Sequence, residues 1–125
     1  MRPALADTHT LLWWLSDDPR LSAAGRDLIA AGETLVYFSA ASAWEVAIKA
    51  AAGKLVVRAD FVEALEHDRF IELPINARHA IAAGSLPLLH RDPFDRMIAA
   101  QANVEGLVVI TADQHIAAYG VPVLW

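Results

Sequence analysis

Near its C-terminus the chain reads Leu107-Val108-Val109-Ile110-Thr111-Ala112-Asp113, an uninterrupted apolar and β-branched run that ends at an acid. A strand that is buried on both faces has such a continuous pattern, whereas a strand with one wet face alternates apolar and polar residues. Strands of the first kind belong to parallel sheets that helices cover on both sides. The run therefore predicts a covered parallel sheet with a carboxylate at the end of one strand.

The rest of the chain alternates short apolar strands with helical segments. Further strands are expected at residues 3–6, 35–39, 70–73 and 121–124. Helices are expected at residues 11–15, 23–31, 43–52, 61–68, 77–84, 93–105 and 114–119. Four of these helices have predicted N-caps, namely Ser22, Asp60, Asn76 and Asp92. Because parallel neighbours need crossover connections, this order predicts a single-domain α/β/α sandwich with a mostly parallel sheet of about five strands.

Composition fits one folded domain over residues 1–125, since 56% of the residues are hydrophobic and 20% are charged. No stretch without charged residues exceeds 12 positions, whereas a membrane-spanning helix needs roughly 20. The acid Asp7 comes before a signal-peptide core of about 7 to 15 apolar residues could form, so a cytoplasmic location is expected. The chain has no cysteine. Any metal ligands must therefore be oxygen or imidazole.

Four separated acids are expected at the same edge of this sheet. Asp7 follows the first strand and Asp113 the fourth, while Glu45 and Asp95 fall in the first turns of two helices. Ligand sites in open parallel sheets lie outside the carboxyl ends of the strands. Clustered carboxylates repel one another unless a cation compensates, and an all-oxygen cluster suits Mg²⁺ or Mn²⁺. The pattern therefore favours a metal-dependent enzyme.

Each acid also has a structural alternative. Glu45 lies three residues after Ser42, the spacing of a capping box, in which the carboxylate bonds a free N–H at the start of a helix. Asp92 precedes Pro93 and is expected to be an N-cap rather than a ligand. The other acids could end strands, begin helices or favourably face a helix dipole. Both roles stay open for Asp7, Glu45 and Asp113 at this point.

Four segments carry these acids in order: Asp7-Thr8-His9-Thr10-Leu11-Leu12-Trp13-Trp14, Ser39-Ala40-Ala41-Ser42-Ala43-Trp44-Glu45-Val46-Ala47-Ile48-Lys49 with Gly53-Lys54-Leu55, His90-Arg91-Asp92-Pro93-Phe94-Asp95-Arg96-Met97-Ile98-Ala99-Ala100-Gln101-Ala102, and Thr111-Ala112-Asp113. Together they resemble the motifs of PIN-domain nucleases, most closely the VapC-type toxins of bacterial toxin–antitoxin pairs, over essentially the whole chain. The resemblance implies a ribonuclease that uses Mg²⁺ or Mn²⁺, forms a homodimer and is inhibited by a cognate antitoxin.

The resemblance also assigns residues. It places the catalytic, metal-binding acids at Asp7, Glu45, Asp95 and Asp113, with Asp95 chosen over Asp92 because the family's acid is followed directly by a helix. Thr111 resembles the family's hydroxyl residue, which can hydrogen-bond a carboxylate or a water.

Basic residues and histidines accompany the acids. Substrate contacts are expected from Arg96, Lys49 and Thr111, and Lys49 lies one helical turn beyond Glu45. Ordinary solvation is the alternative for the two basic side chains. The histidines closest in sequence to the acids could contact phosphate or carry protons, although surface or capping roles are more common for such residues. They are His9, His90 and His115.

Other function classes lack a residue that they require. A phosphatase of the haloacid dehalogenase type needs a second aspartate two positions after the first, where this chain has His9. A receiver domain needs a lysine near the end of its last strand, and the only lysines are Lys49 and Lys54. A catalytically inactive PIN-like RNA-binding or scaffold module is the remaining alternative. The intact acids and the net charge of −5 argue against it, because proteins that coat nucleic acid carry clustered Lys and Arg.

Overall fold

The computed structural model describes residues 2–57 and 59–125, and positions 1 and 58 lie outside this description. One sheet has the strand order β3-β2-β1-β4-β5, and every neighbouring pair is parallel. The strands are β1 (Ala4–Ala6), β2 (Val36–Ser39), β3 (Ile71–Leu73), β4 (Val108–Ile110) and β5 (Val123–Leu124). The helices are α1 (Thr8–Leu15), α2 (Ala23–Ala31), α3 (Ala40–Ala51), α4 (Phe61–His67), α5 (Ala77–Ser85), α6 (Pro93–Glu105) and α7 (Gln114–Ala117). The predicted α/β class with a five-stranded parallel sheet is confirmed.

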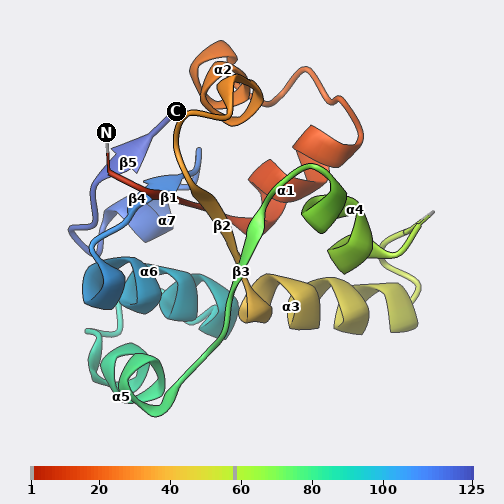
Figure 1. The fold of residues 1–125 in the computed structure, drawn as a ribbon. Coiled ribbons are helices and arrows are strands. Elements are labelled where there is room, and N and C mark those ends of the chain that lie inside the picture. The colour runs from red at the N-terminus through yellow and green to blue at the C-terminus, as the bar shows by residue number, and fades with distance from the viewer. Residues whose placement is uncertain (1, 58) are drawn as a thin grey trace.

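Helices cover both faces of the sheet (Figure 1). On one face, Ala6, Phe38 and Ile110 pack with apolar residues of α1, α2, α3 and α4. On the other face, Leu5 and Val109 pack with residues of α6 and α7, while α5 packs against α6. Successive strand residues point to opposite faces, so β1 contributes to both cores. The result is the three-layer arrangement that the uninterrupted apolar strands predict.

Strand β1 lies at the centre of the sheet, between β2 and β4. The chain extends the sheet from β1 through β2 to β3, and then returns to place β4 on the other side of β1. Connections that leave the carboxyl ends of β1 and β4 therefore diverge, and open parallel sheets bind their ligands at such a position. The N–H of Asp7 donates to the carbonyl of Ile110 at 3.2 Å. The first candidate acid thus stands where the two strands end.

Helix α3 begins earlier than the sequence predicts. Its N-cap is Ser39, whose side-chain oxygen accepts the N–H of Ala41 at 3.0 Å. The capping box between Ser42 and Glu45, which the sequence offered as an alternative, is therefore wrong, because both residues lie inside the helix. The Ser42 hydroxyl instead shares a hydrogen bond of 2.9 Å with the hydroxyl of Thr8. The prediction failed because β2 passes directly into α3, with no connecting loop before the helix.

The predicted caps at Ser22, Asp60, Asn76 and Asp92 are confirmed, since each side chain accepts a backbone N–H of its helix's first turn. The last two elements are shorter than predicted. Helix α7 ends at residue 117 and β5 begins at 123, because the chain turns at Gly120 with φ of +81°. Among the described residues, no helix combines the length and apolar character that a bilayer crossing requires.

Replacing Leu5 with alanine should test the packing of the central strand. Leu5 is fully buried among the residues that join the sheet to α6 and α7. Its truncation leaves a cavity there, and we expect the free energy of unfolding to fall by about 2–5 kcal/mol. Urea denaturation measures the change. The matched control Ile81→Ala, where the side chain is 72% exposed, should change the value by less than about 0.5 kcal/mol. Equal effects would contradict the described core.

Candidate functional site

Asp7 follows the last residue of β1 and caps α1. Its Oδ1 accepts the N–H of Thr10 at 2.9 Å, and its Oδ2 accepts a hydrogen bond from the Thr111 hydroxyl. The residue is only 4% exposed. Burial raises the pKa of Asp7, while the hydrogen bonds from Thr111 and Thr10 act in the opposite direction. The fold therefore holds this carboxyl group deep at the edge of the sheet with a fixed orientation.

Thr111 connects two of the acids. Its Oγ1 donates to Asp7 and accepts the N–H of Asp113 at 2.9 Å. Asp113 in turn caps α7, where its Oδ1 accepts the N–H of His115 at 2.8 Å. One hydroxyl thus fixes the acids that follow β1 and β4 relative to each other. A hydrogen bond from Thr111 to a carboxylate is what the resemblance implied, whereas its contact with substrate stays a prediction.

Glu45 lies in the second turn of α3, with a side chain that is 6% exposed. Its Oε2 accepts the Lys49 ammonium at 2.7 Å. Across the described part of the chain, no donor reaches its buried Oε1. A buried carboxylate oxygen without a partner is unfavourable. The open Oε1 is therefore a position where a cation or a water would be stabilised.

Asp95 lies in the first turn of α6, and its Oδ2 is 3.0 Å from Nε2 of His90. Burial and then the charge of Asp92 raise the pKa of Asp95 to about 6; Asp113 and Glu45 add to this shift, and the His90 bond opposes it. Three other carboxyl groups therefore lie within electrostatic range of Asp95. This places it in the same acidic region as Glu45 and Asp113.

Lys49 reaches this region from α3. Its hydrogen bond with Glu45 is the largest cause of its raised pKa, and the charges of Asp92 and Asp95 contribute to the same shift. The structure thus brings the four predicted acids to one edge of the sheet. Thr111 joins Asp7 to Asp113, and the charges of Asp113 and Glu45 act on Asp95. One ammonium balances only part of this negative charge.

The donor set fits a hard divalent cation. Every acid offers oxygen, one buried oxygen lacks a partner, and Asp95 stands where its ionised form is disfavoured. A divalent cation would relieve both unfavourable features, and Mg²⁺ or Mn²⁺ takes such oxygen ligands. That Asp7, Glu45, Asp95 and Asp113 hold such an ion stays a prediction. Of the four, only Asp95 belongs to a group of three or more ligand atoms within 4.8 Å of one another in the described part of the chain.

His90 and Asp92 are candidate metal ligands in the structure, a role that the sequence did not indicate for either residue. Ligand atoms of His90, Asp92 and Asp95 all lie within 4.8 Å of one another. Asp92 is the helix cap that the sequence predicts, but it also borders the acidic region. The only sequence signal was the position of the run His90-Arg91-Asp92 just before Pro93. Spacing alone could not reveal that this segment folds back onto the first turn of α6.

Arg96, which the sequence analysis assigned to substrate, has another role in the structure. Its guanidinium donates to the carbonyls of Ala83, Leu86 and Pro87 at 2.9–3.0 Å. It therefore fastens the end of α5 and the segment that follows it to α6. A contact between Arg96 and substrate stays a prediction, whereas Lys49 is a basic residue that the structure places among the acids.

A parallel sheet covered on both faces, with acids gathered beside its central strand, defines an α/β protein with a candidate cation site. The chain belongs to the PIN domain family, whose model matches residues 4–122. A comparison with curated proteins gives no match.

Similar solved structures include a DNA-bound VapBC from Salmonella typhimurium, with TM-score 0.73 and 21% identity over 99% of this chain and 98% of that chain. A second is VapBC2 from Rickettsia felis bound to a promoter DNA fragment, with TM-score 0.70 and 14% identity over 97% and 96%. A third is a toxin–antitoxin complex from Klebsiella pneumoniae, with TM-score 0.68 and 21% identity over 98% and 96%. At these identities the likeness shows the fold.

The raised pKa of Asp95 predicts how stability depends on pH in the metal-free protein. Between pH 3.8 and about 6 the folded chain keeps a proton that the unfolded chain has lost. The free energy of unfolding therefore falls as pH rises through this window. Asp95→Asn removes the charge and should stabilise the protein above pH 6 by on the order of 1–3 kcal/mol.

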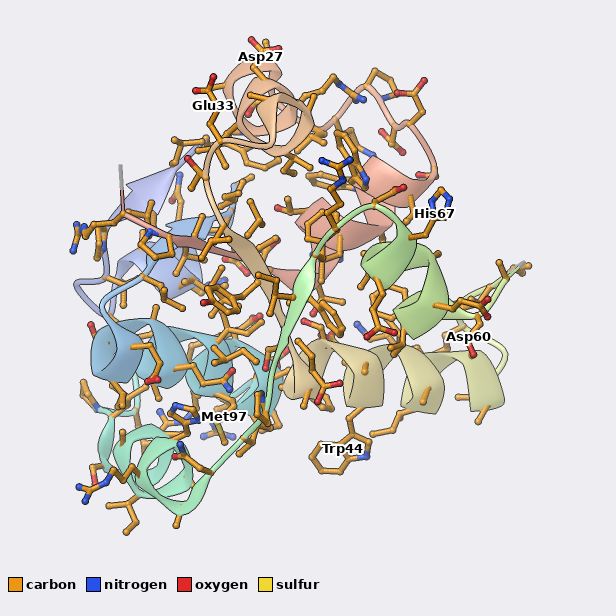
Figure 2. All side chains as sticks on the ribbon, in the orientation of Figure 1. Asp27, Glu33, Trp44, Asp60, His67 and Met97 are labelled. Atoms are coloured by element: carbon orange, nitrogen blue, oxygen red, sulfur yellow. The ribbon has the colours of Figure 1, made fainter. Side chains whose placement is uncertain are left out.

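Urea denaturation in EDTA at a series of pH values measures this effect. The gain from Asp95→Asn should close as pH falls toward 3.8, whereas the exposed control Asp27→Asn on α2 (Figure 2) should show no such profile. A variant that is no more stable than the wild-type protein above pH 6 would show that the Asp95 charge is not destabilising.

Proposed function

We propose that this protein is a ribonuclease that hydrolyses RNA phosphodiester bonds as an endonuclease and depends on Mg²⁺ or Mn²⁺. The observation that carries the proposal is the gathering of Asp7, Glu45, Asp95 and Asp113 beside the central strand of a PIN domain. The unpartnered Oε1 of Glu45 supports a cation there. A negatively charged substrate can approach this region only if its own negative charge is balanced by a cation.

When bound, the ion would orient a phosphate, make a water more acidic and stabilise the oxygen that leaves. The protein residues do the remaining work. Thr111 fixes the carboxyl group of Asp7 by donating to it, and it accepts the backbone N–H of Asp113, which holds that residue beside Asp7. Lys49 holds one oxygen of Glu45, which leaves Oε1 either to hold the ion or to accept a proton from the attacking water. Lys49 also offers positive charge to the phosphate.

An inactive RNA-binding or scaffold module is the competing function. It would not require four acids from separate segments to share one region, where their mutual repulsion opposes folding. The presence of that unfavourable arrangement favours catalysis over scaffolding, because acids with perturbed pKa values gather at functional sites.

RNA cleavage by the purified protein should require a divalent ion and these acids. With Mg²⁺ or Mn²⁺ the wild-type protein should cut RNA, and EDTA should abolish cleavage. Mutation of a residue that supports a metal ligand lowers activity by roughly 10- to 100-fold. Asp7→Asn and Asp95→Asn change proposed ligands themselves, so each should lower the rate by at least roughly 100-fold. Gel analysis of labelled RNA measures the rates.

Asp27→Asn is the matched control, because this exposed carboxylate lies on α2 outside the acidic region. It should cleave at the wild-type rate. Undiminished cleavage by Asp7→Asn or Asp95→Asn would refute the site, and RNA that stays intact with either metal would refute the nuclease.

We further propose that the protein is the toxin of a toxin–antitoxin pair, acts in the cytoplasm and forms a homodimer. Structures with its fold include a toxin–antitoxin complex and two DNA-bound VapBC proteins. An apolar groove of about 720 Å³ lies between α1, α4 and the segment before α4, where Leu12, Val57 and Phe61 line it. Such a groove suits an apolar antitoxin segment. Other exposed apolar side chains, including Trp44 on the outer side of α3 (Figure 2), offer surface for a second copy.

A short antitoxin reading frame should lie immediately upstream of this one. Its product should bind the protein and relieve growth arrest when both are expressed together. Val56→Glu, at a groove position that is 83% exposed, should weaken binding by more than about tenfold because it buries an unpaired charge. RNA cleavage should not change, because Val56 lies outside the acidic region.

Isothermal titration with the purified antitoxin measures the affinity. Val104→Glu, on α6 outside the groove, is the control and should bind normally. Normal binding by Val56→Glu would show that the antitoxin binds outside this groove. The absence of an upstream partner would refute the toxin role and leave the proposed nuclease unaffected.

A further inference from the structure

Beside the four acids, the structure contains a second kind of ligand. His90, Asp92 and Asp95 come from one segment at the start of α6, and their ligand atoms lie within 4.8 Å of one another. All three residues are half-buried. The proposed set of carboxylates uses Asp95 and leaves the imidazole and Asp92 without a function beyond the helix cap.

The imidazole of His90 is held in place before any ion binds. Its backbone N–H donates to the Tyr119 hydroxyl at 3.1 Å, and that hydroxyl is 3.1 Å from the His90 carbonyl oxygen. Its ring stacks on the ring of His115, with centroids 4.2 Å apart and planes 3° from parallel. His115 is itself fixed by Nδ1, which lies 3.1 Å from Oδ1 of Asp113. The ring of His90 is thus preorganised, with Nε2 directed at Asp95.

The spacing of these atoms suits a shared ion. Nε2 of His90 and Oδ2 of Asp95 are 3.0 Å apart. Two adjacent ligands of an octahedral ion, each about 2.1 Å from it, are separated by about 3.0 Å. The helix cap uses Oδ1 of Asp92, so its second oxygen can serve as a ligand.

A separate observation indicates a cation close to this group, because the charge of Glu45 acts on Asp95. Oε1 of Glu45 is more than nine-tenths buried and, among the described residues, has no hydrogen-bond partner. Glu45 holds Lys49, whose charge interacts with both Asp92 and Asp95, so this carboxylate borders the same group. The unpartnered oxygen comes from α3, and the imidazole comes from the segment before α6. Two independent elements therefore present metal-ligand atoms to one region.

We propose that His90, through Nε2, and Asp92, through a carboxylate oxygen, join Asp95 as ligands of the metal ion, and that this mixed site prefers a first-row transition-metal ion such as Mn²⁺ to Mg²⁺. The inference rests on the proposed function, because the ion is the one proposed there. Mg²⁺ favours oxygen ligands and gives up its waters reluctantly, whereas transition-metal ions gain from an imidazole nitrogen. His90 and Asp95 would hold the ion in their deprotonated forms, and a proton that they share would pass to solvent.

Electron spin echo spectroscopy of the Mn²⁺-loaded protein tests the nitrogen ligand directly. The wild-type protein should show the modulation of a directly coordinated ¹⁴N nucleus. His90→Phe keeps a ring that can stack on His115 but has no ligand atom, so the modulation should disappear. The Mn²⁺ affinity of this variant should also fall by at least roughly 10- to 100-fold, which is the cost of losing a residue that supports a ligand. Its Mg²⁺ affinity should change much less.

His115→Phe is the matched control, since it replaces the other ring of the stack and should keep the ¹⁴N modulation. Bound Mn²⁺ without nitrogen modulation in the wild-type protein would overturn the His90 ligand while leaving the proposed ribonuclease intact. Modulation that is lost in His115→Phe and kept in His90→Phe would also overturn it. The modulation in a protein that cuts no RNA would support the mixed site and refute only the nuclease.

Discussion

Repulsion among carboxylates at the carboxyl edge of β1 and β4 is the constraint on which the functional end of this molecule depends. Asp7, Asp95 and Asp113 come from different segments, yet all are brought beside the central strand. The surrounding polar groups limit the cost: Thr111 donates to Asp7, Lys49 to Glu45, and His90 pairs with Asp95. Their compensation is incomplete, since Asp95 keeps a raised pKa and one oxygen of Glu45 has no partner among the described residues. A positive charge at this edge would offset the repulsion that remains.

The fold creates this edge through the position of β1. All three of its residues are fully buried, so helices can cover both faces of the strand. The strand order puts β2 on one side and β4 on the other, and the connections that leave β1 and β4 diverge. The guanidinium of Arg96 donates to the backbone carbonyls of Ala83, Leu86 and Pro87, and so holds the chain before α6 against this helix. That attachment, with the hydrogen bonds of Tyr119, keeps His90 next to Asp95.

Structural and chemical roles coexist at this site. Asp7 caps α1 with one oxygen and accepts the Thr111 hydroxyl with the other, while Asp113 caps α7. A helix cap uses one or two lone pairs of a carboxylate, which leaves others for a cation. The choice between cap and ligand, which the sequence left open for these residues, is therefore not exclusive. Glu45 differs, because the capping role that its spacing suggested is absent and its free oxygen is buried.

The sequence by itself determined the α/β class, the parallel sheet and four of the helix caps, because strand burial and helix starts leave local patterns in residue order. It also nominated the four acids through their positions after strands and at helix starts. Only the tertiary structure decided that α3 starts at Ala40, that Arg96 binds carbonyls and that His90 stacks on His115. These features arise from contacts between segments far apart in the chain, such as the hydrogen bond from Thr111 to Asp7, and sequence spacing carries no record of such distances.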